Sequence, residues 1–95
     1  MSVILIVDTK VNNPEAYETY KAQARPLVEK NGGRYLVRGG AHKVIEGSWN
    51  PTRLVVIEFP DQASFEGFDD SPQYREVMKI RHANAESHMV TVESL

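Results

Sequence analysis

The sequence predicts a single α+β domain in which helical segments alternate with strands. The chain has 95 residues, which is room for one domain and no more. Short runs of β-branched and aliphatic residues, such as Val3–Val7, are typical of strands. Pairs of a capping residue and a proline, such as Asn13-Pro14, begin segments whose apolar residues recur at helical spacing. We therefore expect residues 1–95 to fold as one unit.

The first half of the chain predicts a strand, a helix and a second strand. Val3–Val7 is the first strand, and polar residues from Asp8 onward end it. Asn13 caps a helix that begins at Pro14 and stops at Gly32-Gly33, where one glycine is expected to be left-handed. Residues 34–38 form the second strand. We interpret Gly39-Gly40 as a bulge inside a longer strand that continues from His42 to Glu46.

The second half predicts a strand, a broken helix and a final strand. A turn at residues 47–51 leads into the third strand, residues 53–59. Asp61 caps the second helix, and Ser71-Pro72 is a second cap-and-proline pair that breaks it. His88–Glu93 is the last strand. This βαββαβ order predicts a ferredoxin-like fold, with a four-stranded antiparallel sheet, the first and third strands in its centre, and the helices on one face.

Composition narrows the function classes. There is no cysteine, which excludes disulfides and thiolate chemistry. The net charge is -2 with no basic run, so we expect no nucleic-acid partner. No apolar run approaches the ~20 residues of a membrane span, and the N-terminus lacks the features of a signal peptide, so we expect a cytoplasmic protein without a membrane partner.

The two central strands predict a homodimer. Each of these strands carries apolar residues on both faces of the sheet: Ile4 and Ile6 point away from Leu5, and Leu54 and Val56 point away from Val55. Two helices cover only one face of the sheet, so the helix-free face is left apolar. A second copy, packed sheet on sheet about a two-fold axis, is the expected cover, and a monomer with an open apolar face is the alternative.

Several segments together resemble a family of bacterial proteins, the domain of unknown function numbered 1330. The resemblance is carried by Gly32–Gly40, Glu46-Gly47, Trp49, Arg53–Pro60, Ser71-Pro72, Tyr74 and Arg81. Membership implies a dimeric α+β barrel. The resemblance also implies kinship with cofactor-free monooxygenases, muconolactone-type isomerases and haem-binding or haem-degrading relatives, although it assigns no role to any residue.

Arg81 is the most informative polar residue. Its spacing places it on the inward stripe of the second helix, where an arginine needs a partner or a route to water. Glu46 and Glu58 are candidate partners on the neighbouring strands. Arg81 is therefore either a cation that grips an anionic ligand or one half of a structural ion pair.

A cleft between helices and sheet is the predicted ligand site. The candidate ligand-binding residues are Tyr17, Arg38, Glu46, Trp49, Tyr74 and Arg81, of which Glu46, Arg81 and Tyr74 are also the catalytic candidates. In an enzyme, Glu46 is the expected base, Arg81 holds an anionic or enolate oxygen, and a tyrosine donates a proton. For Trp49 interface packing is the competing role, and for Tyr17 and Tyr74 core filling.

The histidines indicate no metal site. His42, His82 and His88 show no ligand spacing, so we expect no metal and no cofactor. His82 invites comparison with haem-binding relatives, but it lies about 100° around the helix from Arg81. We expect a protein that binds or transforms a small anionic or aromatic molecule. Two alternatives stay open: a dimerisation module without a ligand, and a cofactor-independent monooxygenase or isomerase.

Overall fold

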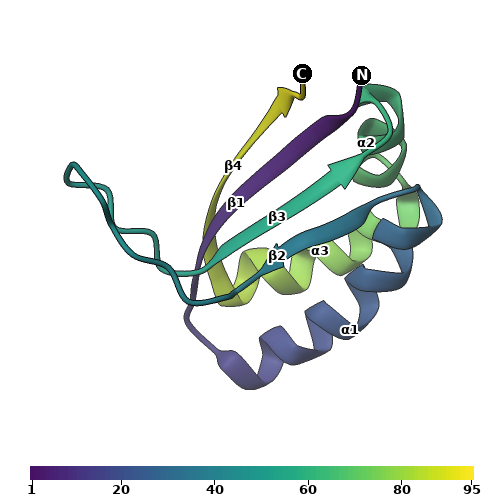
Figure 1. Cartoon of the computed structure of the whole chain (residues 1–95). Coiled ribbons are helices and arrows are strands. Elements are labelled where there is room, and N and C mark those ends of the chain that lie inside the picture. Colours follow the sequence, from purple (N-terminus) through teal and green to yellow (C-terminus); the bar gives the residue numbers. More distant parts are fainter.

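The computed structural model describes all residues, 1–95, and contains four strands and three helices (Figure 1). The elements in chain order are β1 (Val3–Val11), α1 (Pro14–Lys30), β2 (Arg34–Arg38), β3 (Leu54–Phe59), α2 (Gln62–Asp69), α3 (Pro72–Asn84) and β4 (Ala85–Glu93). The predicted α+β order is confirmed. The last strand begins at Ala85, directly after α3, and not at His88 as predicted.

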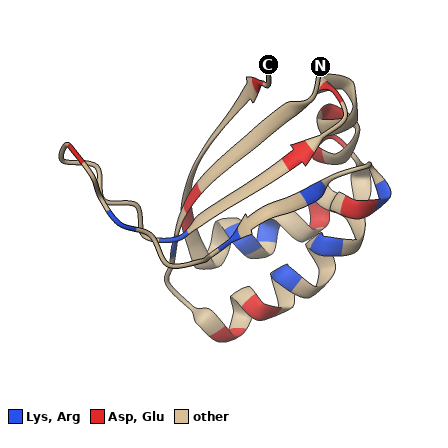
Figure 2. Ribbon diagram, in the orientation of Figure 1, with Lys and Arg blue, Asp and Glu red and all other residues tan.

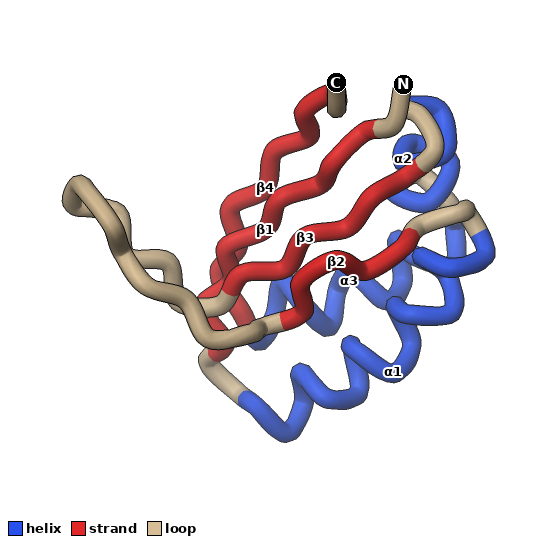
Figure 3. The backbone as a smooth tube through the Cα atoms, viewed as in Figure 1, coloured by secondary structure: helices blue, strands red, loops and turns tan.

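The strands form one antiparallel sheet in the order β2-β3-β1-β4. The first and third strands of the chain thus occupy the centre, as predicted, and the helices lie on one side of the sheet (Figures 1 and 3). This is the ferredoxin-like arrangement. Its consequence is a two-layer molecule in which one face of the sheet has a helical cover and the other has none.

Side-chain caps fix where the helices begin. Asn13 accepts a hydrogen bond from the Ala16 amide at 3.2 Å. Ser71 accepts one from the Tyr74 amide at 3.2 Å, which confirms the predicted break between α2 and α3. Gly32 closes α1 with a φ of 85°, the left-handed conformation expected of one glycine in the pair. None of the three helices has the length and apolar character needed to cross a membrane.

The core lies between the helices and the covered face of the sheet. One parity of β1 and β3 supplies its floor, and Phe59 at its centre is fully buried. The ring of Phe59 packs against Phe65 and Phe68 of α2, with centroids 5.6 and 5.7 Å apart. Val28 of α1 is only 1% exposed. These contacts attach the helical layer to the sheet and fix the position of the cleft described below.

The opposite face of the sheet carries an apolar patch and has no cover within the chain. We call it the open face, and its apolar members are Ile4, Ile6, Val37, Leu54, Val56, Val90 and Val92. Ile6 lies directly opposite Val56 on one side and Val90 on the other, so the three share this face. Val90 is 59% exposed. The apolar character predicted for the helix-free face is thus present.

Residues 40–51 form an arm, exposed from residue 40 to residue 50, instead of the predicted strand. The prediction that His42–Glu46 extends the second strand is wrong: β2 ends at Arg38, and the chain then leaves the sheet without regular structure (Figure 3). Gly39 is no bulge within a strand. Its φ of 73° turns the chain away from the sheet, and the bulge lies earlier, between Tyr35 and Val37. Without a neighbouring strand to pair with, the β-branched residues of the arm have nothing to hold them in a sheet.

Candidate functional site

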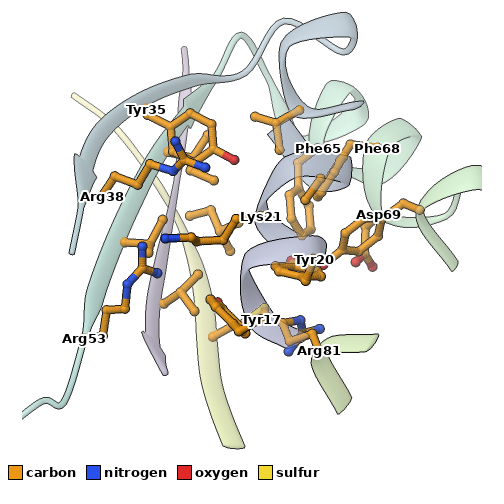
Figure 4. A pocket seen from close by; sticks show the side chains of 18 residues that line it. Tyr17, Tyr20, Lys21, Tyr35, Arg38, Arg53, Phe65, Phe68, Asp69 and Arg81 are labelled. Atoms are coloured by element: carbon orange, nitrogen blue, oxygen red, sulfur yellow. Dashed lines mark hydrogen bonds between the residues drawn. The ribbon is translucent and has the colours of Figure 1, made fainter. Parts of the chain in front are cut away.

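A cleft opens between the covered face of the sheet and helices α1 and α3. The empty space of the cleft, measured out to the surrounding solvent, is about 590 Å³. The centre of a water molecule fits in about 50 Å³ of it. Of the 18 residues that line the cleft, 13 are hydrophobic, four of them tyrosines that also bring a hydroxyl group: Tyr17, Tyr20, Tyr35 and Tyr74. The other five are charged: Lys21, Arg38, Arg53, Asp69 and Arg81. Figure 4 shows these side chains around the cleft. Such a combination of apolar walls and a few polar groups is typical of small-molecule sites.

Arg81 is the buried cation of this cleft. It sits near the C-terminus of α3, is only 7% exposed, and has no carboxylate within ion-pair distance. Its one side-chain contact is a long bond from Nη2 to Nε2 of the exposed His82, at 3.4 Å. Its Nε is buried and has no hydrogen-bond partner. A buried guanidinium N–H without an acceptor is costly, so this group is available to a ligand oxygen.

Two tyrosine hydroxyls meet beside Arg81. The hydroxyl oxygens of Tyr20 on α1 and Tyr74 on α3 lie 2.8 Å apart. Burial, and to a smaller extent the neighbouring Tyr74, raise the pKa of the Tyr20 hydroxyl far above its ordinary value, while the charge of Arg81 opposes this shift. Because one hydroxyl of the pair donates its proton to the other, the accepting hydroxyl keeps a proton that can be donated to a third group.

The other charged side chains of the cleft lining are predominantly basic. Arg38 and Arg53 have no carboxylate within ion-pair distance and instead lie over the rings of Tyr35 and Tyr17, at 5.1 and 5.7 Å from the centroids. Lys21 is paired with Glu18 at 2.7 Å. The only acidic side chain of the lining is Asp69, which lies 3.6 Å from Arg75. The cleft therefore favours an anionic ligand.

Basic residues are present on the elements that form the cleft. Figure 2 shows Lys and Arg on β2, α1 and α3, with acidic residues interspersed along α1. The surface as a whole carries a net charge of -2, so the basic lining of the cleft is a local feature. The positive charge of the cleft lining thus differs in sign from the net charge of the chain.

The structure brings four of the six predicted ligand-binding residues to the cleft and leaves two outside it. Tyr17, Arg38, Tyr74 and Arg81 line the cleft, whereas Glu46 and Trp49 lie on the exposed arm. The Trp49 indole donates to Oδ2 of Asp8 at 3.1 Å. Because the strand that was expected to carry Glu46 does not form, this carboxylate has no place beside Arg81 in its own subunit.

The predicted ion pair between Arg81 and the sheet is also absent. The other candidate partner, Glu58, belongs to the open face, where it accepts bonds from Arg34 at 2.7 Å and from Ser2 at 2.8 Å. Both bonds lower the pKa of the Glu58 carboxyl, and the bond from Arg34 has the larger effect. Strand parity explains the result: Glu58 points away from the helices, and a carboxylate there is on the wrong side of the sheet for Arg81.

The six predicted ligand-binding residues leave out five polar members of the cleft, which are Tyr20, Lys21, Tyr35, Arg53 and Asp69. Tyr20 had a signal, because it lies three residues after Tyr17 on the same helical face. Arg53 had a weaker one, because it shares the strand parity of Val55 and Ile57, although the strand pattern alone does not say which parity the helices cover. Asp69 had none, since it lies at the end of α2, where a side chain's direction depends on the tertiary fold. The three histidines belong to no cluster, and no group of three metal-ligating side chains occurs in the structure.

Comparison with solved structures shows the fold. The protein of unknown function RPA0582 from Rhodopseudomonas palustris superposes with a TM-score of 0.83 at 22% identity, over 99% of this chain and 82% of that one. SnoaB, a cofactor-independent oxygenase from Streptomyces nogalater, gives a TM-score of 0.70 at 14% identity, over 99% and 93% of the two chains.

A third structure adds an oligomeric description. It is a dimeric ferredoxin-like protein of unknown function from Thermobifida fusca, with a TM-score of 0.61 at 14% identity over 99% and 92% of the two chains. At these identities the likeness establishes architecture and not activity. No curated protein matches the sequence. A family profile matches residues 2–95, and on that match the chain belongs to the family described as a domain of unknown function, DUF1330.

Proposed function

We propose that this protein is a homodimer that binds a small anionic ligand with an apolar, flat body in the cleft between its helices and its sheet. The observation that carries the proposal is the buried Nε of Arg81, which has no partner in the chain. The surrounding walls are hydrophobic, so they suit the body of such a ligand. The guanidinium suits its carboxylate or enolate oxygen, because it offers two parallel N–H donors.

The contacts in the cleft support this orientation of the ligand. Arg81 and the pair of tyrosine hydroxyls, Tyr20 and Tyr74, gather at one place. The aromatic rings of Tyr17 and Phe68 belong to the same lining and present flat apolar surface. A ligand with its acid group at Arg81 and its body along these rings supplies the missing acceptor and covers apolar area at once.

The proposal is tested by watching the Arg81 Nε–H directly. In a ¹⁵N-labelled protein, Arg81→Met identifies this resonance by removing it. We expect titration with 2-naphthoate to shift the Arg81 Nε–H resonance, because the carboxylate becomes its acceptor, whereas the neutral isostere 2-naphthamide binds at least about tenfold more weakly. Arg81→Lys keeps the charge but loses the two-donor geometry, so its affinity for 2-naphthoate should fall between those of the wild type and Arg81→Met.

An unchanged Nε–H resonance at millimolar 2-naphthoate, with a lower melting temperature as the only effect of Arg81→Met, would overturn the proposed site. Arg81 would then be a structural residue. The module without a ligand predicts neither a cleft nor a buried polar group without a partner, and the chain has both. These two features are the reason for preferring ligand binding to that alternative.

The homodimer in this proposal follows from the open face. Seven apolar residues lie uncovered on one side of the sheet, and a structural neighbour from Thermobifida fusca is described as dimeric. Packing the open faces of two copies against each other removes this surface from water. Sedimentation velocity at micromolar concentration should give the mass of two chains, and a stable folded single copy would refute the dimer.

A reaction on the bound ligand is a second candidate function, favoured by the hydroxyl pair. Tyr20 and Tyr74 hold a free proton beside the cation Arg81, which is an arrangement suited to protonating a carbanion or enolate. SnoaB, which shares the fold, is described as a cofactor-independent oxygenase. If ligand turnover is found, Tyr74→Phe should lower kcat by about 10²-fold or more while leaving 2-naphthoate affinity within about threefold. Unchanged kcat would exclude Tyr74 from the reaction.

A further inference from the structure

We infer that the arm, residues 40–51, is a clasp that reaches across the two-fold axis and packs on a second copy of this chain. The inference rests on the homodimer of the proposed function and adds to it a specific contact outside the sheet. It assigns a role to Trp49 and to the neighbouring apolar residues of the arm, which lie outside the cleft. The partner that the arm contacts is thus a second copy of this chain.

The arm carries large apolar side chains that are exposed in the single chain. Ile45 is 86% exposed and Trp49 61%, and all residues from 41 to 50 are exposed. No backbone group from residue 40 to 51 makes a backbone–backbone hydrogen bond. An extended segment with free backbone donors and acceptors and large apolar side chains is suited to packing on, and pairing with, another chain.

The arm is anchored where it joins the open face. Its base is held by Asp8, whose carboxylate accepts from the Trp49 indole at 3.1 Å and from the Thr52 amide at 2.9 Å. Asp8 has the same strand parity as Ile6, so these bonds place the base of the arm on the open face. A groove lies along the arm and includes Leu54 of that face. Its empty space, measured out to the solvent as for the cleft, is about 660 Å³. The apolar surface of the sheet thus continues into the arm.

The arm enlarges a small open face. Four strands about 4.8 Å apart, paired over about six residues, give the sheet a projected footprint of only about 400 Å² on each copy. Trp49 is 61% exposed and Ile45 86%, so both side chains still have surface to bury against a second copy. Packing the arm on that copy therefore adds to the contact area that the two sheets supply.

A cross-linking experiment with isotopic labels decides which subunit the arm touches. Because the chain has no cysteine, Ile45→Cys introduces a unique thiol, which is labelled with benzophenone maleimide. Subunits containing ¹⁴N and ¹⁵N are mixed by refolding and then photolysed. We expect about half of the cross-linked peptide pairs to combine one light and one heavy chain, as random mixing of a two-fold dimer requires. Thr19→Cys on the exposed side of α1 is the control, and we expect it to give no mixed pairs.

Two results would overturn the clasp while leaving the sheet-to-sheet dimer intact. One is a dimer whose Ile45→Cys cross-links always join peptides of the same isotope, because the arm then folds onto its own subunit. The other is an unchanged dimer dissociation constant when residues 41–50 are replaced by a short Gly-Ser linker. We expect that replacement to raise the dissociation constant by at least about tenfold. A wild-type chain that sediments as a monomer refutes the clasp and the dimer together.

Discussion

The two faces of the sheet are built from the same strands but have opposite surroundings. On the covered face, Val3, Leu5 and Val7 of β1 are at most 6% exposed. On the open face, Ile4 and Ile6 of the same strand are half-buried, with only their neighbours in the sheet beside them. Neither the residue types nor the backbone conformation distinguishes the two sets. The helices do, because they supply a second layer on one side only.

This difference shows which part of the chain completes its own structure. The helices that pack on the covered face belong to the same 95-residue chain, and the cleft lies between them and this face. The open face and the arm present apolar groups for which the chain offers no cover. A single chain completes the first region, whereas the apolar groups of the second region have no cover within the chain, and in the proposed dimer the second copy supplies that cover.

The largest expected effect is on the covered face. Phe59→Ala should lower the free energy of unfolding by about 3–5 kcal/mol, because Phe59 is fully buried and its loss leaves a cavity between sheet and α2. Phe65→Ala is the matched control, since Phe65 is only partly buried, and we expect it to cost clearly less. Equal losses in urea denaturation would show that the core is not centred on Phe59.

Replacing a glycine by alanine should have a smaller effect on the unfolding free energy, and the size of this effect should differ between the packed domain and the arm. At Gly33 a Cβ would lie 2.5 Å from Cγ1 of Val28 and 2.9 Å from Cε1 of Phe59, so Gly33→Ala should cost about 1–3 kcal/mol. At Gly40 a Cβ would meet nothing within 4 Å. Gly40→Ala should therefore change the unfolding free energy by less than about 0.5 kcal/mol. A large loss at Gly40 would mean that the start of the arm is closely packed.

The smallest expected effect concerns Asp8, which joins the arm to the sheet. The hydrogen bond from Trp49 lowers the pKa of the Asp8 carboxyl below its usual 3.8, and the bond from Thr52 adds to this. Because the folded-state pKa is depressed, the stabilisation is present above pH 3.8 and is lost as the pH falls through the folded-state value. We expect Trp49→Phe to raise the pKa of Asp8 toward 3.8, measured by NMR titration of its carboxyl carbon. An unchanged pKa would show that the indole bond is not formed in solution.

The candidate site was only partly predictable from sequence. Helical spacing placed Tyr17, Tyr74 and Arg81 on the inward side, because a residue's angle around a helix follows from its position in the chain. Glu46 was misplaced, since its assignment required a strand to continue past Gly39. The β-branched residues of that segment favour a strand, but a strand also needs a neighbour to pair with, and none is present.

The sequence by itself determined the order of the elements, the positions of the helix caps and the break at Ser71-Pro72, because each of these depends on residues close together in the chain. It also determined that both faces of the central strands are apolar. Only the tertiary structure decided that Glu58 lies on the opposite side of the sheet from Arg81, that Arg53 joins the cleft, and that residues 40–51 stand away from the domain. Those results depend on contacts between distant segments, and such contacts exist only once the helices have packed on the sheet.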